Sequence, residues 1–213
     1  MTFVECKAIL FDLDGTLVDS GSCIERLWYQ WAQENHLDTK YVLSIIHGRT
    51  IEETLKLISS YFYNQHCVDE IKERAIAELN QVKPIAGAAD FIKTIPAGRM
   101  AIVTSGAKKV SMQSIISAGI PVPDIMVTSE DISRGKPNPE PYLKAAEILG
   151  VQPSECLVFE DADSGIQSAL AAGMSVIIIG ANSHLLSSNG IAHVDNYKGL
   201  NVEIEGHSMI LKW

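Results

Sequence analysis

Two aspartates, Asp12 and Asp14, stand one residue apart in the stretch FDLDGTLVDS, directly after an apolar run. At the end of a strand, residues i and i+2 project to the same side, so both carboxylates can face one reacting centre. Two like charges this close call for a cation. We expect Asp12 to act as a nucleophile and Asp14 to give and take a proton.

Other polar side chains follow other apolar, β-branched runs. Thr104 and Ser105 come after AIV, Lys136 lies in the loop after DIMVTS, and Glu160 and Asp161 follow CLVF. In a doubly wound parallel sheet, ligands bind at the carboxyl ends of the strands. These residues should therefore meet Asp12 and Asp14 in one polar cluster.

The residue types in this cluster suit a phosphoryl group held beside a metal ion. Carboxylates are hard oxygen ligands that favour Mg²⁺, and no cluster of Cys and His indicates zinc. Thr104 and Ser105 offer hydroxyls ahead of a helix N-terminus, which can bind an anion, and Lys136 adds a positive charge. The predicted metal ligands are Asp12, Asp14, Glu160 and Asp161.

The surrounding pattern predicts an α/β fold, a Rossmann-like doubly wound parallel sheet with helices on both faces. Short apolar runs alternate with amphipathic stretches that end at glycine, as in AKKVSMQSIISAG and NPEPYLKAAEILG. The predicted strands are CKAILF, RMAIVT, DIMVTS, ECLVFE and MSVIII. The last stretch, residues 194–213, is weakly patterned and predicts no element.

Residues 20–82 break this alternation and predict an inserted α-helical cap domain. The stretches 24–36, 51–66 and 68–82 place apolar residues three and four apart. The catalytic core would then comprise residues 1–19 and 83–213. The aromatic residues of the insertion fall at helical spacing and are expected in its core: Trp28, Trp31, Tyr61 and Phe62.

Composition excludes several classes of function. The chain has 213 residues, 46% of them hydrophobic, and a formal net charge of −9 without a basic run, which argues against nucleic acid as a partner. No signal peptide and no apolar stretch of about 18 residues is visible, so we expect a cytoplasmic protein without membrane association. Four scattered cysteines are interpreted as structural, His184 is given no role, and no protein partner is implied.

The motifs FDLDGTLVDS, IVTSG, GKPNPEPY and VFEDADSG resemble, in order, the four motifs of the haloacid dehalogenase superfamily. The helical insertion resembles the small cap of its phosphatase and β-phosphoglucomutase branch. This resemblance implies phosphate-ester hydrolysis with Mg²⁺, carried out by Asp12 and Asp14. It also implies phosphate contacts from Thr104 and Lys136 and metal contacts from Glu160 and Asp161.

The resemblance also reaches the cap, where HGRT, residues 47–50, is similar to the equivalent stretch of small sugar-phosphate phosphatases. It implies that Arg49 binds substrate. The fourth motif departs from the usual pattern, because Ala162 replaces a serine and Asp163 adds a carboxylate.

The predicted function is a Mg²⁺-dependent phosphatase for a small phosphorylated metabolite, such as a sugar or polyol phosphate. A phosphosugar mutase uses the same aspartates and stands as the alternative. Haloalkanoate dehalogenation needs neither a second aspartate nor a metal, so Asp14, Glu160 and Asp161 argue against it. A non-catalytic binding module is disfavoured because the motif set is intact.

Overall fold

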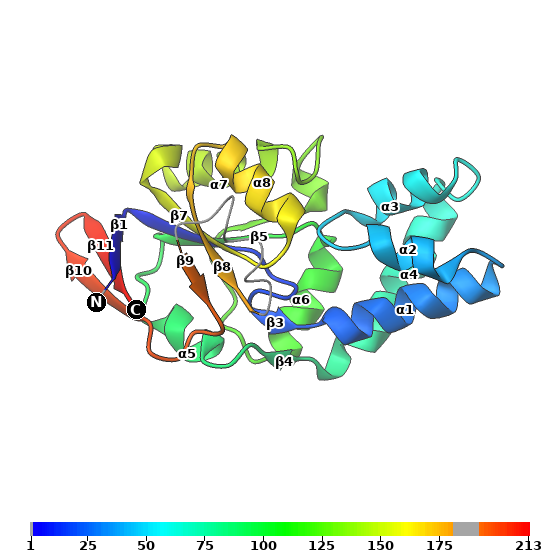
Figure 1. Cartoon of the computed structure of the whole chain (residues 1–213), viewed down its shortest axis with the longest axis horizontal. Helices are drawn as coiled ribbons and strands as arrows, with labels where there is room; N and C mark the ends of the chain where they lie inside the picture. The colour runs from blue at the N-terminus through cyan, green and yellow to red at the C-terminus, as the bar shows by residue number, and fades with distance from the viewer. Residues whose placement is uncertain (1, 181–191) are drawn as a thin grey trace.

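The computed structural model describes residues 2–180 and 192–213; His184 lies outside these ranges. Its centre is a parallel sheet with strand order β6-β5-β2-β7-β8-β9 (Figure 1). The strands are β2 (Ala8–Phe11), β5 (Met100–Val103), β6 (Met126–Val127), β7 (Cys156–Glu160), β8 (Ser175–Ile179) and β9 (Ala192–Val194). The chain runs from β2 outward through β5 and β6, then returns to the other side of β2 through β7 to β9. Strand order therefore reverses at β2.

Helices cover both faces of this sheet, which confirms the predicted fold class. They are α5 (Ala88–Lys93), α6 (Lys108–Ser117), α7 (Glu140–Leu149) and α8 (Asp163–Ala171). Side chains of β2 alternate between the faces, as the two-residue period of a strand requires. Leu10 packs in the cluster that includes Tyr142 of α7 and Ile166 of α8, while Phe11 faces Phe91 of α5.

Between β3 (Val18–Asp19) and β4 (Lys83–Pro84) the chain forms a group of helices, called here the helical unit (residues 21–81). Its elements are α1 (Gly21–Glu34), α2 (Thr39–Ile45), α3 (Ile51–Ile58), α4 (Gln65–Glu78) and the 3-10 turn η1 (Leu79–Gln81). The strands β3 and β4 pair antiparallel, so the unit leaves and rejoins the rest of the chain at adjacent points. Division into a core and a cap at these residues stays a prediction, which this pairing supports.

The helical unit differs from the predicted helices in three places. First, the helix expected over residues 51–66 ends at Ile58, because Ser59 is extended. Second, the helix expected from residue 68 begins earlier, after Asn64, whose side chain accepts a hydrogen bond from the Cys67 N–H. The helix α2 has no counterpart in the prediction. Trp28 and Trp31 are buried as expected, but the expectation that Tyr61 lies in the core is wrong, since it is 79% exposed.

A second, antiparallel sheet contains the last segment of the chain. It consists of β1 (Phe3–Cys6), β11 (Ser208–Lys212) and β10 (Asn201–Glu205), with β11 in the middle. The register places Cys6 opposite Met209, so this sheet anchors the segment directly before β2. Within the described residues, none of the helices combines the length and apolar composition that a bilayer crossing requires.

Candidate active site

Asp12 and Asp14 occupy the turn directly after β2, the strand where strand order reverses. The Asp12 N–H still donates to the Phe159 carbonyl at 3.0 Å, which holds Asp12 beside the end of β7. Asp14 accepts a hydrogen bond of 2.6 Å from the Ser20 hydroxyl. Gly15 follows with φ near +89°, and a Cβ there would lie 2.2 Å from an Asp161 carboxylate oxygen, so only glycine fits this turn.

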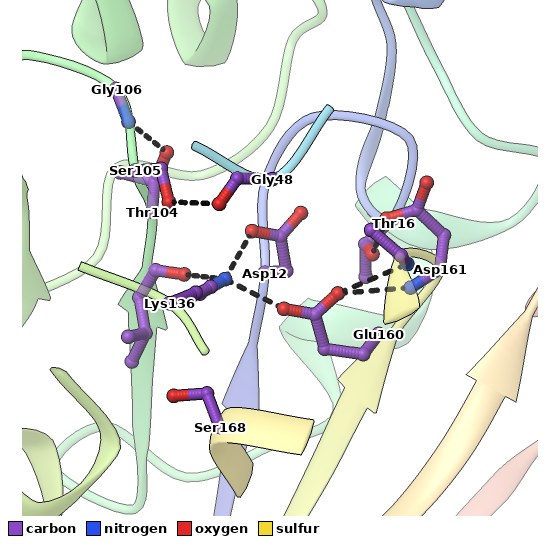
Figure 2. Close-up of polar contacts among 12 residues, drawn as sticks. Asp12, Thr16, Gly48, Thr104, Ser105, Gly106, Lys136, Glu160, Asp161 and Ser168 are labelled. Carbon is purple, nitrogen blue, oxygen red and sulfur yellow. Dashed lines mark hydrogen bonds and ion pairs between the residues drawn. The ribbon is translucent and has the colours of Figure 1, made fainter. Parts of the chain in front are cut away.

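Lys136 joins two of the predicted site carboxylates, as Figure 2 shows. Its Nζ lies 2.6 Å from Asp12 Oδ1 and 2.6 Å from Glu160 Oε1, and it donates to the Val103 carbonyl at 3.0 Å. Burial alone would lower the pKa of Lys136, but the charges of Asp12 and Glu160 outweigh burial and raise it. The lysine is therefore a permanent positive charge at the strand ends.

Each oxygen of the Glu160 carboxylate accepts two hydrogen bonds. Its Oε1 accepts hydrogen bonds from Lys136 and from the Tyr142 hydroxyl, the latter at 2.7 Å. Its Oε2 accepts from the backbone N–H groups of Asp161 and Ala162 at 3.1 and 3.3 Å. Glu160 is 1% exposed, so these donors stabilise a charge that burial would otherwise oppose.

Asp12, Glu160 and Asp161 form a compact group in which the candidate ligand oxygens lie within 4.8 Å of one another. The Thr16 hydroxyl donates to Asp161 at 3.0 Å. Burial raises the pKa of Asp12 well above its usual value, and burial with repulsion from Glu160 raises that of Asp161 to about 7. Three carboxylates crowded in this way suit a divalent cation.

Two further aspartates of the quoted motifs, the predicted ligand Asp14 and Asp163, lie outside this carboxylate group. The side chain of Asp14 is bonded to Ser20, and the prediction that Asp14 is a metal ligand stays a prediction. Asp163, which occupies the first position of α8, is exposed and lines the cavity described below.

Thr104 and Ser105 follow β5 and precede α6. The Thr104 hydroxyl accepts a hydrogen bond from the Gly106 N–H at 3.0 Å. The Ser105 hydroxyl instead donates to the carbonyl of Gly48 at 2.9 Å, so it holds the loop of the helical unit between α2 and α3 (Figure 2). Any contact of Ser105 with an anion would then come from its backbone N–H or from its hydroxyl after a change of partner.

A cavity of about 610 Å³ lies between the strand ends and the helical unit. Its floor is polar and includes Asp12, Asp14 and Thr104. Its opposite wall is largely apolar and comes mostly from the helical unit: Ile24, Leu27, Trp28, Ile46, Ile71 and Leu79. The arrangement gives a charged reacting centre beneath an apolar cover.

Arg49 also lines the cavity, with one guanidinium nitrogen donating to the Ile45 carbonyl at 2.8 Å. This bond fixes the base of the α2–α3 loop and leaves the other guanidinium donors for a ligand. His47, in the same loop, lies 3.3 Å from the Glu25 carboxylate. The structure thus places the loop HGRT at the cavity.

Sequence reasoning missed several residues that hold the site together. Ser20 and Thr16 bond Asp14 and Asp161, and Tyr142 bonds Glu160. Ser20 and Thr16 lie within the first motif and Tyr142 ends the third, so their positions in these motifs were the available signal.

Comparison with known proteins identifies a family. The family described as "Haloacid dehalogenase-like hydrolase" matches residues 9–179. Among curated proteins, hexitol phosphatase A of Escherichia coli is 38% identical over 84% of this chain and 85% of its own length. A fructose-1-phosphate phosphatase of E. coli is 28% identical over 79% of this chain and 94% of its own length. Among solved structures, a β-phosphoglucomutase from Clostridium difficile superposes with a TM-score of 0.78 at 23% identity, over 92% of this chain and 93% of that one.

Proposed function

Because the chain belongs to the haloacid dehalogenase-like hydrolase family, we propose that it is a Mg²⁺-dependent hydrolase of small sugar or polyol phosphates. The chain is a phosphatase. The observation that carries the finer proposal is the convergence of Asp12 and Glu160 from separate strand ends onto one cavity, with Lys136 bonded to both.

In the proposed first step, a carboxylate oxygen of Asp12 attacks phosphorus. The bond between phosphorus and the ester oxygen breaks, and Asp14 gives its proton to the departing oxygen. Burial raises the pKa of Asp14, with the Ser20 hydrogen bond opposing, which supports a carboxyl that holds a proton to donate. Asp12 then carries an aspartyl-phosphate.

In the second step, water attacks the aspartyl-phosphate and Asp14 takes the proton of that water. The phosphorus bond to Asp12 breaks, which releases inorganic phosphate and restores both aspartates. Lys136 and Thr104 would hold the phosphoryl oxygens, where negative charge spreads in the transition state. Lys136 already lies 2.6 Å from the nucleophile's carboxylate, so a phosphoryl group bound to Asp12 comes within its reach.

The residues fit the proposed Mg²⁺ site. Asp12, Glu160 and Asp161 would hold the ion, because their oxygens form one group and are hard ligands. When bound, Mg²⁺ would neutralise negative charge on the carboxylates and on the phosphoryl oxygens. The raised pKa values of Asp12 and Asp161 reflect carboxylates whose burial disfavours their charge, which a cation offsets.

The proposed substrate class depends on the cavity and on the relatives. A cavity of about 610 Å³ accommodates a small phosphorylated metabolite, and Arg49 provides a donor at its wall. The relatives named as hexitol and fructose-1-phosphate phosphatases support a sugar or polyol as the leaving group. These named relatives do not favour the mutase alternative.

The test is phosphate release from a panel of sugar, polyol, glycolate and nucleotide monophosphates, with Mg²⁺ or with EDTA. We expect release from sugar or polyol phosphates with Mg²⁺ and no release with EDTA. Asp12→Asn should abolish release while the variant still folds, as checked by circular dichroism. Release that persists in Asp12→Asn would contradict the nucleophile, and release only from nucleotides would contradict the substrate class.

A further inference from the structure

Two hydrogen bonds between described residues join the helical unit to the segments at the sheet's carboxyl edge. One is the bond from Ser105 to the Gly48 carbonyl, at 2.9 Å (Figure 2). In the other, the backbone N–H of Gly135 donates to Glu53 Oε1 at 3.2 Å. Gly135 directly precedes Lys136 in the chain, so the second bond acts on the segment that carries the site lysine.

Carboxylates accept hydrogen bonds from three consecutive backbone N–H groups of the segment 133–136, called here the Lys136 segment. The N–H groups of Ser133 and Arg134 donate to Glu140 of α7 at 2.6 and 3.1 Å. The next one, of Gly135, donates to Glu53 of α3. The segment is therefore fixed from two sides, by a helix that packs on the sheet and by a helix of the helical unit.

Glu53 is oriented for this contact by its own helix. Its Oε2 accepts a hydrogen bond of 3.1 Å from the Thr50 N–H, while the Thr50 hydroxyl accepts from the Glu53 N–H at 3.1 Å. This capping box at the start of α3 leaves Oε1 directed at Gly135. A Cβ at position 135 would lie 2.7 Å from both carboxylate oxygens of Glu53, so any larger residue there would push the carboxylate away from its present position.

We propose that Glu53 is a positioning residue that couples coverage of the cavity by the helical unit to the placement of Lys136. The inference rests on the proposed function, in which Lys136 holds the phosphoryl group. Gly135 is buried, so its N–H would lose its partner if Glu53 were removed while the unit stayed in place. The enzyme would then favour arrangements in which the unit is withdrawn or the Lys136 segment is displaced.

The variant Glu53→Asp separates this role from helix capping. It keeps a negative charge at the start of α3, where the helix dipole favours it, but its side chain is one methylene too short to reach Gly135. Glu52→Asp is the matched control, because Glu52 is also in the first turn of α3 and pairs with Lys72 at 3.4 Å within the helical unit. Glu53→Gln keeps one oxygen that can accept from Gly135.

We expect Glu53→Asp to lower kcat/KM about tenfold for the best substrate of the phosphate-ester panel. Glu52→Asp should change it less than twofold, and Glu53→Gln should fall between Glu53→Asp and the wild type. If Glu53 only capped its helix, Glu53→Asp would retain most of the wild-type activity. Equal kcat/KM for Glu53→Asp and Glu52→Asp would therefore overturn the proposal.

Amide hydrogen exchange, resolved by NMR, tests the contact without any turnover. In Glu53→Asp the Gly135 N–H should exchange about tenfold faster, while the N–H groups of Ser133 and Arg134 keep their protection because Glu140 holds them. Unchanged exchange at Gly135 would show that the contact is absent in solution and would refute the proposal.

Adding inorganic phosphate and Mg²⁺ to the exchange experiment separates failure of this inference from failure of the proposed function. We expect the two additions to slow exchange at Gly135 further in the wild type and to have no such effect in Glu53→Asp. The same response in both proteins would overturn the coupling. If the wild type released no phosphate from any ester, the proposed function would fail, and this arm would still decide the coupling.

Discussion

Replacing Lys136 with methionine should destabilise the protein strongly in the absence of metal. The lysine side chain is 1% exposed, and its Nζ lies 2.6 Å from both Asp12 and Glu160. Breaking a buried ion pair by removing one partner leaves an uncompensated charge and costs about 3–5 kcal/mol. For a domain of this size each kcal/mol corresponds to roughly 2–4 °C, so the melting temperature should fall by about 6–20 °C.

The pair between Lys7 and Glu155 offers a matched control. Its N–O distance is also 2.6 Å, but its side chains are 44% and 32% exposed. An exposed pair contributes about 1 kcal/mol or less, so Lys7→Met should cost far less than Lys136→Met. The two pairs thus differ in burial at equal distance.

The assay is urea unfolding followed by circular dichroism, with EDTA present. We expect Lys136→Met to lower the free energy of unfolding far more than Lys7→Met does. A difference of less than about 1 kcal/mol between the two variants would refute the argument that burial makes the Lys136 ion pairs costly to break. Adding Glu160→Gln to Lys136→Met removes one unpaired charge, so the double variant should lose less than the sum of the two single losses.

Three further predictions concern the metal, the α2–α3 loop and the thiols. EDTA should abolish phosphate release and excess Mg²⁺ should restore it; activity in EDTA would contradict the metal requirement. Gly48→Ala should lower kcat/KM at least tenfold, since φ is +73° and the new Cβ would lie 1.9 Å from the Ser164 hydroxyl oxygen, and Ser164→Ala should partly rescue it. At pH 8, iodoacetamide should modify Cys23, which lines the cavity, but not Cys6 or Cys156. Burial raises the pKa of Cys6 to about 12 and that of Cys156 to about 11, so both thiols stay protonated at this pH. Mass spectrometry identifies the labelled cysteines, and labelling of either buried thiol in the folded protein would contradict this prediction.

The strand-end residues could be predicted from the sequence because the signal for each is local. An apolar, β-branched run followed at once by Asp12 or Glu160 specifies both a buried strand and a polar group at its end. In a parallel sheet the carboxyl ends of the strands share one edge. Their convergence can therefore be predicted without knowing which side chains lie between them. That reasoning predicted the fold class, which the structure confirms.

The partners of these residues could not be predicted in the same way. Ser105 donates to the Gly48 carbonyl, which lies 57 positions away in the helical unit, and Tyr142 reaches Glu160 only because α7 packs against the sheet. Such pairs depend on how elements dock, which periodicity does not specify. The strand β10 was missed for a different reason, since most of it is exposed and it has no buried face to mark it.

The apolar packing of the helical unit has a consequence for how the molecule unfolds. Trp31 and Leu55 of the unit belong to the same continuous buried cluster as Phe11 and Phe91 beneath the sheet. The buried residues of the helical unit are therefore continuous with the core beneath the sheet. We expect melting to proceed as one cooperative transition with calorimetric and van't Hoff enthalpies in agreement.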